Sequence, residues 1–542
     1  MNKKAWLLFF VLLLTVSTAL FGCSSDDGAS EDGGDGGTSE EGGSDAEDTL
    51  VFGRGGDSVG LDPITVTDGE SFKVTKNVFE TLIEFGKEDT EVNPGLAAEW
   101  DVSEDGLTYT FTLQEGVTFH DGEAFNADAV VYNFERWASG TEDKFYYYKS
   151  MFGGFGDDEG HVIESVTATD DMTVEIKLKR PQAPFLKNLA MSPFGIASPK
   201  ALDEMGDDEF NENPVGTGPF KFVEWRRNER IVLEKFEDYW QEGLPKLNQV
   251  IFRSIPENSA RLNALTSGEI DLADGVNPSD SAQVEGNDNL QLFERPSMNV
   301  GYLGLTTTRE PFDDPKVRQA MNHAINRQAI VDAFFEGRAE VAKNPIPPVI
   351  AGYNDDIEGY EYDVDRAKEL LEEAGLGDGF EMDLWAMPVP RPYMPDGQKV
   401  AEAIQNDLAA VGITANIVTN EWATYLDKAR LGEADAFLLG WTGDNGDADN
   451  FLYVLLDQDN IGSNNYTYYE NQDLHDLLIE ARSEVDEDKR NQLYMEAQEI
   501  IHEDAPWVPL AHSTPLMAGS ANLKDFVAHP TGSDNLMDAY FE

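Results

Sequence analysis

The feature that most constrains the fold is a regular alternation of predicted strands and helices between residues 380 and 441. The residue pattern predicts strands at 380–387, 413–419 and 436–441, and helices at 398–411 and 423–431. Strands that alternate with helices form parallel β-α-β units. The chain is therefore predicted to have an α/β fold.

Capping residues mark two more helices upstream. Asp314 and Pro315 supply an N-cap and a first helical residue ahead of a helix at 317–325. Asn326 can cap the helix that follows, which is predicted to stop at Gly337. Both helices are amphipathic and are expected to cover a core.

Residues 1–22 have the pattern of a signal peptide. A charged start is followed by an apolar run at 5–16, which is too short for a comfortable bilayer span, and then by small residues. Cys23 follows directly, is the chain's one cysteine, and resembles the lipid-modified cysteine of a bacterial lipoprotein. Phe21 departs from the usual lipoprotein motif, and the alternative is an ordinary signal peptide followed by a chance cysteine.

Residues 23–48 are predicted to be a lipidated cysteine followed by a disordered acidic tether. After Cys23 the segment contains only Ser, Gly, Thr, Ala, Asp and Glu, which cannot build a core. The net charge of the whole chain is −64, so nucleic acid is not expected as a partner. The acidic surface indicates a salty or alkaline medium outside the cell or, alternatively, an ordinary solvated surface.

The remaining residues, 49–542, are too many for one hydrophobic core, so two or three subdomains are expected. An enzyme is the first alternative, because paired carboxylates could serve a glycosidase. However, the sequence has no nucleophile elbow, phosphate-binding loop, dinucleotide fingerprint or zinc-protease motif. Residues 445–449 resemble a calcium loop but lack its glycine and its final glutamate, so no metal site is predicted.

Two loops follow predicted strands and carry opposite charges. Ligands of parallel sheets bind beyond the carboxyl ends of the strands, where loops 387–393 and 443–450 are expected to lie. Arg391 stands between prolines and suits a two-point grip on a carboxylate, and Asp444 supplies the opposite charge. The pair matches a zwitterion with an amine at one end and a carboxylate at the other. The alternative is that both are ordinary surface charges.

Several segments resemble the dipeptide-binding proteins of bacterial ABC importers, which belong to solute-binding protein family 5. The closest agreement is at 354–356, 383–389, 391–393 and 440–447. The first half agrees with the wider group of peptide- and nickel-binding proteins at 94–97, 100–110, 119–122 and 213–220.

The resemblance implies a two-lobed fold of the periplasmic-binding-protein type, with a third subdomain, that closes over its ligand. Lobe I is expected at 49–80, 195–295 and 508–542, the extra subdomain at 81–194, and lobe II at 296–507. The implied function is capture of dipeptides or short peptides for an ABC importer, without catalysis and without a cofactor. Haem or a metal chelate is the alternative ligand.

The resemblance also assigns roles to residues. Asp444 would pair with the α-amino group of the peptide and Arg391 with its α-carboxylate. The same pocket would be lined by Trp385, Tyr393, Gly440, Trp441 and Thr442, and faced from the first lobe by main-chain groups of the turn that contains Gly56 and Asp57. The implied partners are permease subunits with cytoplasmic ATPases, and the implied location is the outer face of the cell membrane, where the protein is lipid-anchored and monomeric.

Overall fold

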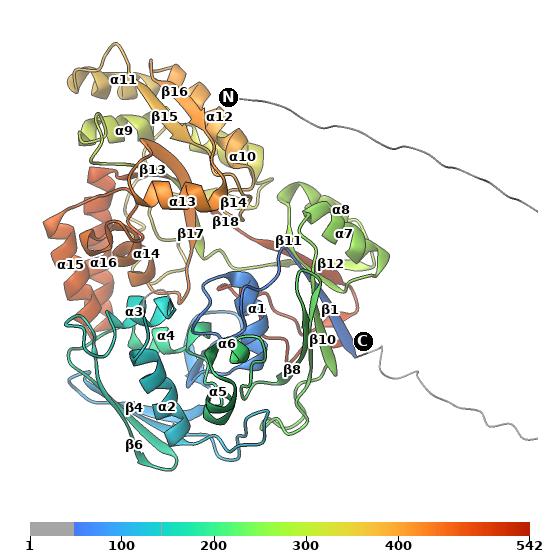
Figure 1. Ribbon diagram of the computed structural model, residues 1–542. Coiled ribbons are helices and arrows are strands. Elements are labelled where there is room, and N and C mark those ends of the chain that lie inside the picture. The colour runs from blue at the N-terminus through green and yellow to red at the C-terminus, as the bar shows by residue number, and fades with distance from the viewer. Residues whose placement is uncertain (1–47, 142–143) are drawn as a thin grey trace, which may run out of the picture. The chain divides into compact units, whose positions relative to one another are not determined.

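A seven-stranded sheet joins segments from the beginning, middle and end of the chain (Figure 1). The computed structural model describes residues 48–141 and 144–542. The sheet has the order β12-β19-β11-β1-β10-β9-β8, and β1 runs parallel to both of its neighbours. Its strands are β1 (Thr49–Arg54), β8 (Phe220–Arg226), β9 (Arg230–Lys235), β10 (Gln249–Ser254), β11 (Leu272–Val276), β12 (Leu290–Glu294) and β19 (Leu516–Ser520). This sheet forms the first lobe.

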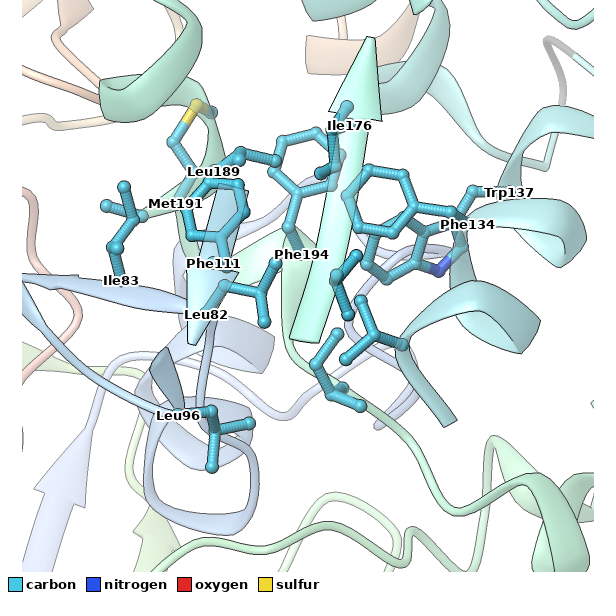
Figure 2. Close-up of a cluster of buried hydrophobic side chains, with 14 of the residues drawn as sticks. Leu82, Ile83, Leu96, Phe111, Phe134, Trp137, Ile176, Leu189, Met191 and Phe194 are labelled. Atoms are coloured by element: carbon cyan, nitrogen blue, oxygen red, sulfur yellow. The ribbon is translucent and has the colours of Figure 1, made fainter. Parts of the chain in front are cut away.

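A smaller antiparallel sheet lies within the predicted extra subdomain. Its order is β4-β5-β7-β6, and its strands are β4 (Ala97–Val102), β5 (Thr108–Leu113), β6 (Ile163–Asp170) and β7 (Thr173–Leu178). Helices α2 (Ala127–Ala138), α3 (Tyr146–Phe152) and α4 (Phe185–Leu189) belong to the same region. Figure 2 shows its core, in which Phe111 and Ile176 of the sheet lie among Phe134, Trp137 and Phe194. This core also takes in Ile64, Val66 and Phe72, which precede the predicted subdomain, so it is shared with the adjoining part of the chain.

A six-stranded mixed sheet forms the second lobe. Its order is β14-β18-β13-β17-β15-β16. The strands are β13 (Asn299–Leu305), β14 (Ala339–Val341), β15 (Glu381–Trp385), β16 (Thr414–Val418), β17 (Ala436–Thr442) and β18 (Trp507–Ser513). Strand β15 is parallel to both β16 and β17, whereas β17 pairs antiparallel with β13. The parallel units predicted from the alternating pattern are therefore confirmed, within a sheet that also has antiparallel strands.

The helices of the second lobe begin where their caps predict. Asp314 accepts a hydrogen bond from the N–H of Lys316 at the start of α9 (Pro315–Ala324), and Asn326 caps α10 (Arg327–Phe334). Helix α10 ends at Phe334 rather than at the predicted Gly337, because the chain turns from Phe335 onward. The two predicted crossover helices are α12 (Gly397–Ala409) and α13 (Trp422–Arg430).

Strand β18 lies in the second lobe rather than the first. The predicted boundary at residue 507 cuts through it, but β18 pairs with β13 and β14 up to Ser513. The other predicted boundaries stay predictions. The signal peptide at 1–22, Cys23 and the tether up to residue 47 lie outside the described residues, and no helix in the described part of the chain is long and apolar enough to cross a membrane.

Candidate functional site

The two charged loops leave the same edge of the second-lobe sheet. Strands β15 and β17 are parallel neighbours, so the loops that follow them start side by side. The Tyr393 ring connects the loops, because it packs directly on the main chain of Gly440 in β17. A Cβ atom added at Gly440 would lie 2.3 Å from Tyr393 Cδ2, so this position has room only for glycine. The structure therefore brings loop 387–393 against the strand that leads to Asp444.

The Asp444 carboxylate lies among neutral hydrogen-bond donors. Its Oδ1 accepts a hydrogen bond of 3.2 Å from the Tyr147 hydroxyl, and its Oδ2 accepts one of 3.2 Å from Asn450 Nδ2. Across residues 48–141 and 144–542, no lysine, arginine or histidine forms an ion pair with this carboxylate. Burial raises the pKa of Asp444 to about 6, and the hydrogen bonds from Asn450 and Tyr147 oppose the rise. Asp444 is half-buried, and a partly desolvated carboxylate without a cation is well suited to receive an ammonium group.

The main chain around Asp444 is held from several sides. The N–H of Asp444 donates a hydrogen bond of 2.9 Å to Asn450 Oδ1, which also accepts one of 3.0 Å from Trp441 Nε1. The N–H of Gly443 donates to the carbonyl oxygen of Met298, at 2.8 Å, where the chain enters the second lobe. These contacts set the direction in which the Asp444 side chain points.

Helix α4 of the extra subdomain contacts the same loop. Lys187 Nζ donates a hydrogen bond of 3.0 Å to the carbonyl oxygen of Gly446, and Asn445 Nδ2 donates one of 2.8 Å to Asn188 Oδ1. Together with Tyr147 of α3, these residues connect loop 443–450 to a part of the chain far away in sequence.

Arg391 lies at the exposed surface of the other loop. Its Nη1 donates a hydrogen bond of 3.3 Å to the carbonyl oxygen of Pro390, and its guanidinium lies 5.7 Å from the centre of the Trp422 ring. The chain has 103 acidic residues against 39 Lys and Arg, yet none of the described carboxylates pairs with Arg391. Because a guanidinium has five N–H donors, several remain available to a ligand carboxylate.

The other predicted residues of the second lobe lie at different depths. Tyr393 is buried, and its burial raises the pKa of its hydroxyl, an effect that Arg391 opposes. Trp441 and Thr442 are half-buried at the end of β17. Trp385 is only 5% exposed and packs against Tyr425 in the core. A role in ligand binding stays a prediction for all of these residues.

In the first lobe, the predicted turn with Gly56 and Asp57 is held by contacts with residues from other parts of the lobe. The Asp57 carboxylate accepts hydrogen bonds from Trp225 Nε1, at 3.0 Å, and from the N–H of Asn228, at 2.7 Å, and it pairs with Arg54 at 3.3 Å. The carbonyl oxygen of Gly56 accepts a hydrogen bond of 3.1 Å from Ser254 Oγ. Ligand contacts from this turn are therefore expected from main-chain N–H groups.

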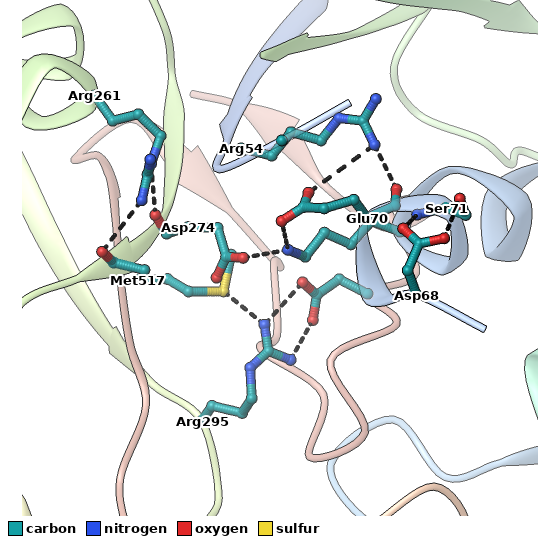
Figure 3. Close-up of polar contacts among 12 residues, drawn as sticks. Arg54, Asp68, Glu70, Ser71, Arg261, Asp274, Arg295 and Met517 are labelled. Atoms are coloured by element: carbon teal, nitrogen blue, oxygen red, sulfur yellow. Dashed lines mark hydrogen bonds and ion pairs between the residues drawn. The ribbon is translucent and has the colours of Figure 1, made fainter. Parts of the chain in front are cut away.

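Charged residues behind this turn form a partly buried network (Figure 3). Arg54 is fully buried and donates to Ser58 Oγ and to the carbonyl oxygen of Glu70. Lys73 pairs with both Glu70 and Asp274. Because opposite charges alternate through the network, the end of β1 is fastened to α1 (Gly69–Val78).

No sequence pattern singles out Tyr147, Asn450 or Trp422. Tyr147 stands in a run of three tyrosines, but 297 residues separate it from Asp444, so no local pattern connects them. Trp422 begins α13 and is recognisable only as a helix residue. Tyr147 and Trp422 lie beside Asp444 and Arg391 through the packing of distant elements, whereas Asn450 belongs to the same loop as Asp444.

One group of side chains in the described residues has the composition of a metal site. Donor atoms of Asp457, Asp459 and His475 lie within 4.8 Å of one another. The Asp457 carboxylate already accepts hydrogen bonds from the N–H of Asp459, at 2.9 Å, and contacts His475 Nδ1 at 3.0 Å. These contacts explain why the three side chains lie close together, and a metal ion is not needed to explain it.

Comparisons with known proteins identify the family. Residues 91–463 match the bacterial extracellular solute-binding proteins, family 5 Middle. The chain is 40% identical over 511 residues to the dipeptide-binding protein of Escherichia coli, covering 91% of this chain and 95% of that protein. It is 38% identical over 509 residues to heme-binding protein A of Haemophilus influenzae, covering 91% and 92%.

A solved structure agrees with the same assignment. An ABC transporter-associated periplasmic binding protein from Helicobacter pylori, in complex with the peptide STSA, is similar with a TM-score of 0.81 and 38% identity, covering 91% of this chain and 98% of that chain. The expected two-lobed α/β fold is thereby confirmed. This chain belongs to family 5 of the bacterial extracellular solute-binding proteins.

Proposed function

We propose that this protein captures dipeptides and other short peptides between its lobes and delivers them to the permease of an ABC importer. The observation that carries the proposal is the chemistry at the sheet edge. Asp444 is a half-buried carboxylate without a cation, and Arg391 is an exposed guanidinium without a carboxylate. A peptide zwitterion supplies both missing charges at once. The names of the Escherichia coli and Helicobacter pylori proteins agree with this ligand class.

Recognition of the two termini explains how one site would accept many sequences. The charged ends and main chain are common to all peptides, whereas hydrated side-chain pockets tolerate variation. Closure of the lobes converts occupancy into a shape that a permease can recognise, provided that the ligand binds the closed form more tightly. In this scheme the protein binds and releases its ligand without chemical change, so peptides should be recovered intact after incubation, as mass spectrometry can check.

Isothermal titration tests the proposal with a free amino acid, a dipeptide and a tetrapeptide, each also in its N-acetylated form. We expect the dipeptide to bind and its acetylated form to be silent, because acetylation removes the charge that Asp444 would receive. Equal binding of both forms would exclude Asp444 as the amino-group partner. Absence of binding by every peptide would exclude peptides as the ligand class.

Haem is the second candidate, because the Haemophilus influenzae relative of similar identity is named for haem binding. Titration with haem, followed by its absorbance, would test it directly. If a dipeptide displaces haem, the two ligands share the site between the lobes. If both bind together, haem has a site of its own.

The N-terminal segment supports a membrane location in this proposal. Lipidation of Cys23 would hold the monomeric protein at the outer face of the cell membrane, near its permease. A Cys23→Ser variant is then expected in the culture medium or periplasm rather than in the membrane fraction. Retention of this variant in the membrane would exclude Cys23 as the anchor.

A further inference from the structure

Loop 443–450 carries three aspartates, and the structure gives them different partners. Both carboxylate oxygens of Asp447 pair with Arg490, at 2.9 and 2.6 Å. Asp449 pairs with Nε of Arg482 at 3.0 Å. Asp444 has only neutral donors, so the three residues differ in their charge balance although they lie within six positions of one another.

The two arginines come from neighbouring helices that pack beside the loop. Arg482 is on α15 (Gln472–Ser483) and Arg490 is on α16 (Glu487–Asp504), which lie side by side and next to α14 (Asp449–Leu456) (Figure 1). Their sequence positions place both arginines where the two helices join. The helix pair therefore supplies the loop with two positive charges from one direction.

The Asp447–Arg490 pair is well buried and geometrically constrained. The Asp447 side chain is 3% exposed and that of Arg490 is 14% exposed. Arg490 also donates hydrogen bonds to the Tyr494 hydroxyl, at 2.9 Å, and to the carbonyl oxygen of Ala481, at 3.2 Å. A two-point contact with fixed neighbours is the arrangement in which a buried ion pair neutralises both charges.

The charge states of the aspartates reflect these partners. Burial is the largest influence and raises the pKa of the Asp447 carboxyl, but the charge and hydrogen bonds of Arg490, together with the charge of Lys187, outweigh it and lower the pKa below its ordinary value. At Asp444 no cation opposes burial, and the pKa rises to about 6. The loop thus contains one aspartate, Asp447, whose ionised and paired form is favoured, and two, Asp444 and Asp449, whose pKa burial raises, with the charge of Arg482 opposing the rise only at Asp449.

We propose that Arg482 and Arg490 are positioning residues that, by neutralising Asp449 and Asp447, leave Asp444 as the one carboxylate of the loop available to a ligand. This rests on the proposed role of Asp444 as the acceptor of the peptide amino group. A single carboxylate matches the single charge of an ammonium group. Calcium binding, by contrast, needs six to eight oxygen ligands, several of them carboxylate oxygens. The arginines therefore make the loop selective for an organic ammonium group over a divalent metal ion.

Other charged and titratable groups also face Asp444. Tyr146 and Tyr147 approach from α3 and Lys187 from α4, and Asp68 acts on Tyr147 from the start of α1. None of these supplies an anion as close to the loop as an unpaired Asp447 would be. Removal of Arg490 is therefore expected to act on Asp444 through Asp447.

The test compares Arg490→Met with the double variant Arg490→Met/Asp447→Asn. The single variant leaves Asp447 unpaired, so the midpoint of the pH dependence of dipeptide binding should rise by about one pH unit, because a nearby like charge raises a carboxyl pKa. Calcium should then compete with the dipeptide, whereas in the wild type we expect no such competition. The double variant also lacks the contact between α16 and the loop, but it has no extra anion. Its binding midpoint should therefore return to that of the wild type, and calcium should again have no effect.

Arg366→Met is the matched control, because Arg366 lies in the same lobe and forms only surface ion pairs. It should leave both readouts unchanged. An unaltered midpoint in a folded Arg490→Met protein would overturn the inference, and so would a double variant that behaves like the single one, since the pair would then act by anchoring alone. If Arg490→Met does not fold, Arg490→Gln and its double variant with Asp447→Asn replace it in the same comparison.

The N-acetylated dipeptide separates this inference from the proposed function. If the wild type binds the dipeptide and its acetylated form equally, the role of Asp444 fails, and the inference fails with it. If the wild type distinguishes them but Arg490→Met shows neither the shift nor the calcium effect, only the inference about the arginines is wrong.

Discussion

The two loops at the edge of the second-lobe sheet are held to very different degrees. Loop 443–450 is fixed by two partly buried arginines, by Asn450 and by contacts from the extra subdomain. The loop with Arg391 is closed by main-chain hydrogen bonds of 3.1 and 2.9 Å to Met394, and the Arg391 side chain is exposed. The two charges of the proposed site therefore differ in mobility.

This difference assigns different tasks to the two ends of a peptide. A preorganised carboxylate at Asp444 gives the amino group one fixed position, because little ordering is needed when the ligand arrives. A long, exposed arginine side chain has many rotamers and can follow the carboxylate of peptides that differ in length or shape. We therefore expect selectivity for the amino end to be strict and selectivity for the carboxyl end to be more tolerant.

The largest effect should follow from Asp444→Asn, which keeps the shape and removes the charge. Loss of one partner of a buried ion pair costs about 3 kcal/mol or more, which corresponds to at least about a hundredfold weaker binding of a dipeptide. Titration calorimetry measures this loss. Asp427→Asn, at an exposed position of α13, is the control and should bind normally. Retained affinity in folded Asp444→Asn would show that the fixed loop is not the amino anchor.

A smaller loss is expected from Arg391→Gln. Hydrogen bonds to a charged group contribute about 2 kcal/mol, so dipeptide affinity should fall about thirtyfold. A dipeptide amide, which lacks the carboxylate, should bind the variant and the wild type equally. Arg430→Gln, another exposed arginine of the same lobe, is the control. A variant that discriminates against the amide as the wild type does would contradict the assignment of Arg391.

Acidification should weaken dipeptide binding about tenfold between pH 7 and pH 5. The free Asp444 carboxyl has a pKa of about 6 and must be ionised to pair with an ammonium group, so protonation competes with the ligand as pH falls. Affinity is thus expected to be full above pH 7 and to decline through pH 6. Titrations at several pH values measure this, and Asp444→Asn should show no such decline. A flat profile in the wild type would place the titrating group elsewhere.

The smallest effect is expected from Tyr147→Phe, which removes one neutral hydrogen bond to Asp444. Loss of such a bond costs about 1 kcal/mol, or about fivefold in affinity. The midpoint of the pH dependence should also rise, because the Tyr147 hydrogen bond favours the ionised carboxylate. Tyr148→Phe serves as the control, because Tyr148 lies on the same helix as Tyr147 but its hydroxyl contacts His161. An unchanged midpoint would show that Tyr147 does not support the charge of Asp444.

Local patterns predicted the second lobe well. The strands and helices between residues 380 and 441 are each present within a few residues of the predicted ends, because hydrophobic periodicity and capping act over short distances. The predicted end of the second lobe at residue 507 was less accurate. Every residue of strand β18 is buried, and a buried strand looks the same in either sheet until its partners are known.

The candidate site was predicted in part. Arg391 and Asp444 follow from charged loops after strands and from the family resemblance, and the structure places these loops at one sheet edge. The Asp57 carboxylate already accepts hydrogen bonds from distant residues, namely Trp225 and Asn228 of the first lobe. Nothing in the local sequence indicates that engagement, because those partners lie more than a hundred and fifty residues away.

The amino-acid order alone specified the elements, the parallel unit and the positions of the charged loops, because short-range periodicity and turn chemistry encode them. It did not specify which aspartate of loop 443–450 stays unpaired. Asp444, Asp447 and Asp449 stand in similar acidic surroundings, and only the folded chain brings Arg490, 43 residues from Asp447, and Tyr147, 297 residues from Asp444, to their respective partners. A carboxylate in low dielectric takes its charge state from the groups that packing places around it, and those groups come from distant parts of the chain.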